Sequence, residues 1–115
     1  MLRFSHHAIG VQQGRQILFS DFENDGPMWT GNGPRHVRVH VLFPQPFLAT
    51  PAVQLSMSMW DSAGDSNQRG DLSAENISAE GFDIIFRTWG DSRMARVRAD
   101  WTAIGAVPHL DQWDV

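Results

Sequence analysis

The stretch of sequence that decides the fold is residues 81–91, Gly-Phe-Asp-Ile-Ile-Phe-Arg-Thr-Trp-Gly-Asp. Residues in it alternate with a period of two, which predicts a β-strand with Phe82, Ile84 and Phe86 on one face and Asp83, Ile85 and Arg87 on the other. Trp89 then stands directly before Gly90-Asp91, a turn signal. We expect a core strand that carries an indole out to a loop. There it serves as a ligand platform or, in the alternative interpretation, caps the core.

The rest of the chain has the composition of one globular domain. It contains 115 residues, of which 42% are hydrophobic and 19% charged, and this is enough chain to bury an ordinary core. The net charge is −4, which argues against a nucleic-acid partner, because such modules usually present a basic face. Cysteine is absent, so neither a disulfide nor a thiolate metal site is expected. No signal peptide and no membrane span are expected either, since no long apolar run occurs.

Short alternating runs divided by Gly, Pro, Asn and Asp clusters recur along the chain, and no long helical period does. The predicted strands are residues 8–12, 15–22, 37–43, 53–59, 72–78, 81–88 and 94–104. Six or seven short strands with turn signals about ten residues apart favour an all-β fold, a small antiparallel β-sandwich. We expect residues 1–8 to be an N-terminal extension, residues 9–105 the sandwich and residues 106–115 a C-terminal tail.

Catalytic signals are weak in this sequence. His36 and His40 share one strand face with Arg38 between them. An imidazole zinc site usually needs a third ligand, so we prefer a solvent-facing or subunit-facing pair to a metal site. The spacings of nucleophile-elbow, zinc-protease and phosphate-loop motifs are all absent. We therefore predict a protein that is not an enzyme and has neither catalytic residues nor a metal or other cofactor.

A more coherent set of residues combines Arg69, Trp89 and Asp91 with the loop at residues 31–33, Gly-Asn-Gly. A sugar presents an apolar C–H face and a fringe of hydroxyl groups. An indole matches the face, a guanidinium donates in a fixed geometry, and Asn or Asp oxygens accept. This set suffices chemically for binding carbohydrate, although the same residue types occur in every soluble domain.

These residues lie within a longer pattern that resembles the H-type lectin family, the group of snail agglutinins and discoidin C-terminal domains. The resemblance is carried by Phe-Pro-Gln-Pro-Phe at 43–47, Pro-Ala-Val-Gln-Leu-Ser at 51–56, Trp-Asp at 60–61, Gly-Phe at 81–82, Thr-Trp-Gly-Asp at 88–91 and Asp-Trp-Thr-Ala at 100–103. Val-Gln-Gln-Gly at 11–14 and Trp29 are similar to the family's opening. The likeness covers roughly residues 9–105 and needs few gaps in its second half.

The resemblance implies a six-stranded antiparallel β-sandwich that assembles into a homotrimer, with metal-independent sites for N-acetylgalactosamine- or galactose-type sugars near the protomer boundaries. By position, Arg69 and Trp89 fall on the family's sugar-binding arginine and tryptophan. Asn32 falls on the family's acceptor aspartate, so it keeps a carbonyl acceptor but loses the charge. Gly90 stands where the snail lectins have histidine, which removes one contact.

We therefore predict a lectin that recognises terminal GalNAc- or galactose-like sugars or bacterial surface polysaccharide, with Asn32, Arg69, Trp89, Gly90 and Asp91 as the binding residues. Trimerisation would make binding multivalent, and the arginine-rich face of the last strand, with Arg96 and Arg98, is our candidate interface. The alternative is a structural or attachment subunit, such as a spike or fibre component of a phage-like particle. In that case the protein would act on a particle surface, with or without glycan binding.

Overall fold

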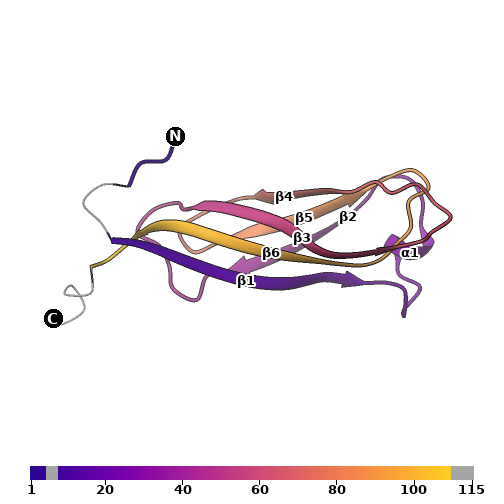
Figure 1. Cartoon of the computed structure of the whole chain (residues 1–115), viewed down its shortest axis with the longest axis horizontal. Coiled ribbons are helices and arrows are strands. Elements are labelled where there is room, and N and C mark those ends of the chain that lie inside the picture. Colours follow the sequence, from indigo (N-terminus) through magenta and orange to yellow (C-terminus); the bar gives the residue numbers. More distant parts are fainter. Residues whose placement is uncertain (5–7, 110–115) are drawn as a thin grey trace.

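A computed structural model describes residues 1–4 and 8–109 of the chain. Within them lie six strands and one short helix (Figure 1). The elements are β1 (Ala8–Ser20), α1 (Pro27–Thr30), β2 (Arg35–Leu42), β3 (Ala52–Ser62), β4 (Asp71–Glu75), β5 (Gly81–Thr88) and β6 (Met94–Val107). The prediction of an all-β chain is confirmed.

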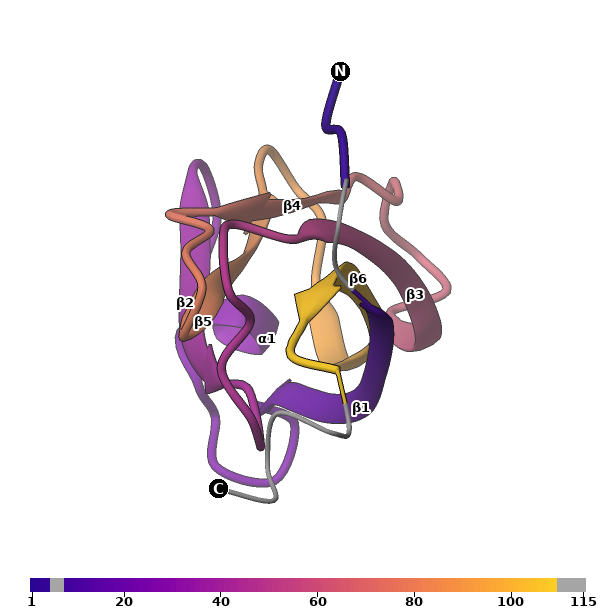
Figure 2. The ribbon, with the colours of Figure 1, turned by 90° about the vertical axis from the view of Figure 1, so that its left-hand side faces the viewer.

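The strands form two three-stranded sheets, ordered β1-β6-β3 and β2-β5-β4, in which every neighbouring pair is antiparallel. Seen end-on, the two sheets lie on opposite sides of a common interior (Figure 2). This is the six-stranded antiparallel β-sandwich that the sequence predicted.

The core is built from the central strand of each sheet, because a central strand is flanked on both sides as well as covered on one face. Phe82, Ile84 and Phe86 of β5 are fully buried, as their alternation predicted. On the opposite sheet, the inward residues of β6 are also buried, and the ring of Trp101 meets that of Phe82 edge-on at 5.6 Å between centroids. Ile85 is fully buried too, although it lies on the outer face, between Arg38 and Ser73 in the neighbouring strands.

Several boundaries differ from the prediction: β4 ends at Glu75 where a strand to residue 78 was expected, and β3 runs on to Ser62. β1 is one strand, with a bulge between Ile17 and Phe19, where two strands were expected. Gly14, which falls between the two predicted strands, lies inside β1, where only a glycine fits because a Cβ would come within 2.5 Å of the indole of Trp101. At the other end β6 continues to Val107, beyond the predicted start of the tail, and the loop containing Met28 and Trp29 forms the single helical turn α1.

Candidate carbohydrate site

The loops that contain the candidate residues gather at one end of the sandwich. In Figure 1 this end carries α1 and lies opposite the beginning of β1. Thr88 ends β5 as a buried residue, and the next residue, Trp89, is 45% exposed. This exposure favours the interpretation of Trp89 as a ligand platform over a cap on the core.

Arg69 and Asp91 form an ion pair between the loop before β4 and the loop after β5. Asn67 holds the same carboxylate: its backbone N–H donates to Oδ2 at 3.3 Å and its side-chain amide donates to both oxygens. These hydrogen bonds, that of Arg69 above all, lower the pKa of Asp91 to about 2. The pair is consequently ionised at neutral pH and the carboxylate is fixed in place.

Arg69 also lies directly beside the Trp89-Gly90 turn. Its backbone carbonyl accepts a hydrogen bond of 2.6 Å from the hydroxyl of Thr88, and Nη1 lies 3.0 Å from the place that a Cβ on Gly90 would occupy. Nε and Nη2 of Arg69 donate to no group within residues 1–4 and 8–109. The arginine is thus oriented through one nitrogen, and its other donors have no partner within the described residues.

The third loop, residues 31–33, joins this cluster through its backbone. The N–H of Gly33 donates to the carbonyl of Gly90 at 2.9 Å, and both glycines have positive φ, 70° and 66°. Asn32 is exposed next to this contact. The structure therefore brings all five predicted residues, Asn32, Arg69, Trp89, Gly90 and Asp91, to the same end of the molecule.

Arg35, at the start of β2, connects these loops to one another. Its five N–H donors reach five backbone carbonyls: Gly33 (2.9 Å), Pro27 and Met28 (3.3 Å each), Gly90 (3.3 Å) and Ser92 (2.7 Å). Burial of the charge lowers the pKa of Arg35. One side chain thus ties α1 and the loop at residues 31–33 to the loop that carries Trp89 and Asp91.

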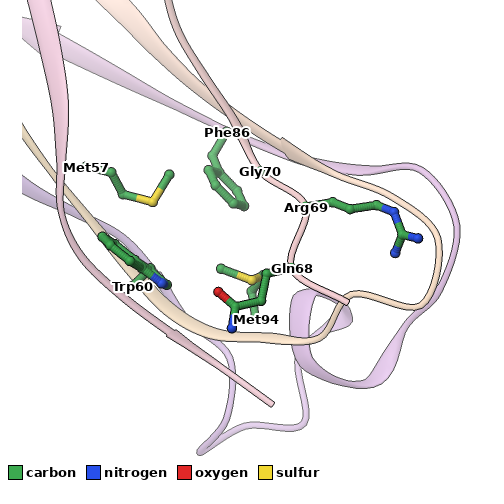
Figure 3. Close-up of a pocket in the computed structure, with 7 residues that line it drawn as sticks. All are labelled: Met57, Trp60, Gln68, Arg69, Gly70, Phe86 and Met94. Atoms are coloured by element: carbon green, nitrogen blue, oxygen red, sulfur yellow. The ribbon is translucent and has the colours of Figure 1, made fainter. Parts of the chain in front are cut away.

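Two pockets flank this cluster. One, of ≈ 320 Å³, opens between β3 and the chain before β4 and is lined by Met57, Trp60, Gln68, Arg69, Gly70, Phe86 and Met94. Figure 3 shows that the Arg69 side chain leads away from the four large apolar side chains of this pocket. The guanidinium therefore lies outside the apolar part of this pocket, where it pairs with Asp91. The second pocket, of ≈ 280 Å³, borders Trp89 on the outer face of the β2-β5-β4 sheet.

His36 and His40, considered above as a weak metal signal, have different surroundings. His40 Nδ1 lies 2.7 Å from Asp83, whose pKa is lowered to about 2 by hydrogen bonds from Asn76, His40 and Arg38. In the described part of the chain, no group of three or more His, Cys, Asp or Glu residues is arranged to hold a metal ion. No helix there is long and apolar enough to cross a membrane.

Sequence reasoning missed the residues that hold the site together. Asn67 sits in a polar loop without any distinguishing pattern, and Arg35 is one arginine among nine. Each is identified only by its partners, which are backbone and carboxylate groups from segments far away in the sequence.

Comparison with known proteins gives consistent results. The family model for the H-type lectin domain matches residues 38–104. A Fuscovulum blasticum protein described as ORF 7 of the ATP synthase subunits region is 56% identical over 108 residues, which is 94% of both chains. Discoidin-2 of Dictyostelium discoideum is 35% identical over 81 residues, 70% of this chain but 32% of the discoidin.

Solved structures show the same likeness. Recombinant discoidin II of Dictyostelium discoideum superimposes with a TM-score of 0.76 at 28% identity, over 92% of this chain and 40% of that one. The tailspike protein gp49 of Pseudomonas phage LKA1 matches with a TM-score of 0.54 at 17% identity, over 85% of this chain and 15% of the tailspike, which shows a shared fold alone. The chain thus spans about a third of the discoidin that it matches in sequence.

Proposed function

This chain belongs to the H-type lectin family, whose members bind carbohydrate without catalysing a reaction, and we propose that its glycan site is the cluster of Arg69, Trp89 and Asp91. The observation that carries the proposal is the oriented guanidinium of Arg69, which lies beside Gly90, the residue that follows the exposed Trp89. The proposed ligands are terminal galactose- or GalNAc-type sugars, or a surface polysaccharide that contains them.

The chemistry of the cluster suits a pyranose. Trp89 exposes an aromatic face on which the apolar C–H groups of a sugar ring pack. The unused donors of Arg69 suit two neighbouring hydroxyl oxygens, and the fixed Asp91 carboxylate accepts hydrogen bonds from hydroxyl groups. Because Asn67 and Arg35 fix these groups beforehand, binding orders few side chains and costs little conformational entropy.

Two positions set the expected strength of binding. Asn32 offers an amide where the family has a carboxylate, so we expect weaker or altered affinity for a vicinal hydroxyl pair. Gly90 offers no side chain. A Cβ at this position would crowd the Arg69 guanidinium, so the arginine occupies space that a larger residue would take. We therefore expect a single shallow site of this kind to bind sugar with low affinity.

Multivalency offsets a weak single site, and we therefore propose a homotrimer. The candidate residues for the interface between protomers are Arg96 and Arg98 of β6. Arg96 pairs with Asp61 at 3.2 Å, and Arg98 donates to the hydroxyl of Ser58 at 3.0 Å, so each has a partner within its own chain. Their role between protomers stays a prediction, and a single-protomer mass in light scattering would contradict it.

A glycan array tests the proposed function. The labelled wild type is compared with Arg69→Ala and Trp89→Ala, and with Trp60→Ala as the matched control. Trp60 also carries an indole and is 56% exposed, and it lies in the apolar part of the pocket of Figure 3, from which the Arg69 side chain leads away. We expect binding to terminal GalNAc- or galactose-type ligands that is lost in the first two variants and kept in the third, with circular dichroism unchanged.

Binding that survives both Arg69→Ala and Trp89→Ala would contradict the proposed site. Silence on an array that includes bacterial polysaccharides would contradict the lectin function and favour the alternative, an attachment or structural subunit. The tailspike likeness shows only a shared fold, so it does not carry that alternative by itself.

A further inference from the structure

The pocket beside Trp89 has a distinctive set of lining residues. It measures ≈ 280 Å³ and is lined by Pro34, Arg35, His36, Arg87, Thr88 and Trp89. His36 and Arg87 are opposite each other in the β2–β5 register, so their side chains share the outer face of that sheet. The indole proposed to stack a sugar therefore forms the wall of a pocket that extends over the sheet.

Every charged residue that lines this pocket is basic. Arg35 hydrogen-bonds only backbone carbonyls, so no carboxylate in the described residues neutralises its charge. His36 pairs with Arg87 through the backbone ladder of β2 and β5, but its imidazole has no hydrogen-bond or ion-pair partner among residues 1–4 and 8–109. The imidazole of His36 is thus available to a ligand, whereas Arg35 contributes its charge alone, because its five donors are already bonded.

Arg87 is the one lining residue with acidic partners, and the strand order places those partners on its far side. Nη2 lies 2.9 Å from Glu75 and Nη1 lies 3.6 Å from Asp71, both on β4. Since the order is β2-β5-β4, these carboxylates lie away from His36 on β2. Nε of Arg87 donates to no group in the part of the chain that the structure describes.

We propose that this pocket binds the carboxylate of an acidic sugar, so that the preferred ligand is a uronate of galactose configuration. The sugar ring packs on Trp89, and its carboxylate accepts hydrogen bonds from Arg87 and His36 while the Arg35 charge adds attraction. This inference rests on the proposed lectin function and specifies its ligand class.

The test uses two ligands that differ only in the carboxylate. A short oligogalacturonate is titrated against the protein by isothermal calorimetry beside the same oligosaccharide after its carboxyl groups have been reduced to hydroxymethyl groups. A charge-assisted contact at an exposed site predicts about 10-fold tighter binding of the uronate. This preference is expected to shrink as sodium chloride is raised, because exposed charges are screened.

Two variants locate the effect. Arg87→Gln and His36→Asn are each expected to reduce the preference for the uronate while binding of the reduced ligand stays the same. Arg15→Gln is the matched control, since it removes one exposed arginine from the other sheet, where Arg15 pairs with Asp100 at 2.9 Å. The His36 variant keeps the test valid if loss of the Arg87–Glu75 pair disturbs the fold.

Each outcome decides a different point. Equal affinity for the two ligands would overturn the acidic-sugar proposal and leave the lectin function intact. A preference that persists in both variants would overturn the assignment of the pocket. If neither ligand binds, nor any neutral galactose-type glycan, the proposed function fails together with this inference.

Discussion

The substitution Arg35→Lys tests whether one side chain organises the site. A lysine carries three donors on a single nitrogen and cannot span five carbonyls from three segments. The two short bonds, 2.7 Å to Ser92 and 2.9 Å to Gly33, each contribute about 1 kcal/mol net, and the three bonds at 3.3 Å contribute less. Allowing for one bond that lysine restores, we expect a loss of about 2 kcal/mol in the free energy of unfolding.

For a domain of this size, such a loss lowers the melting temperature by roughly 8 °C. Thermal unfolding is followed by circular dichroism at one fixed protein concentration, since oligomerisation would make the midpoint concentration-dependent. Arg15→Lys, at an exposed ion pair, is the control and is expected to stay within about 0.5 kcal/mol of the wild type. We also expect weaker glycan binding in Arg35→Lys, because the Gly90 and Ser92 carbonyls lose their anchor. A melting temperature and affinity equal to those of the wild type would refute the reasoning.

Three further predictions concern packing, titration and assembly. Gly14→Ala should destabilise the fold by about 1–3 kcal/mol, because its Cβ would lie 2.5 Å from the Trp101 indole. Gly64→Ala is the control and should change stability little, since a Cβ there meets nothing within 4 Å. Equal denaturation midpoints for the two variants would contradict this prediction. The Asp91 carboxylate should titrate near pH 2 by NMR. Since the pKa of Asp91 in the folded state is lowered from 3.8, the stabilisation that its ionised form gives the fold is present above about pH 4 and is lost as the pH falls through about 2. Arg69→Ala should move the midpoint of the Asp91 titration upward. A wild-type midpoint near 3.8 would contradict the ion pair. Light scattering should give the mass of three chains of 12.9 kDa, and a mass of one chain would end the trimer proposal.

The sandwich was predictable because its strands alternate cleanly. The inward residues of β5 and β6 are apolar at every second position, and burial of one sheet face imposes that same period. The errors have local causes. Gly14 resembles a turn residue in the sequence, yet it is required inside β1 by the ring of Trp101 on the neighbouring strand, a contact between residues 87 positions apart.

The candidate site was only partly predictable. The family pattern pointed to Arg69 and Trp89, and the structure shows that their loops meet. The clamp of Arg35 and the pocket of His36 and Arg87 depend on strand register and on backbone carbonyls, which carry no residue-type signal. No periodicity or motif in the sequence reports such contacts, so only the three-dimensional arrangement reveals them.

The central claim is that sugar binds at Trp89 beside Arg69. The measurement that tests it most directly is an NMR titration of ¹⁵N-labelled protein with N-acetylgalactosamine. The account predicts shifts in the indole N–H of Trp89 and in the amides of Gly33 and Gly90, with the indole of Trp60 unchanged. Shifts centred on Trp60, or no shifts at saturating sugar, would contradict it.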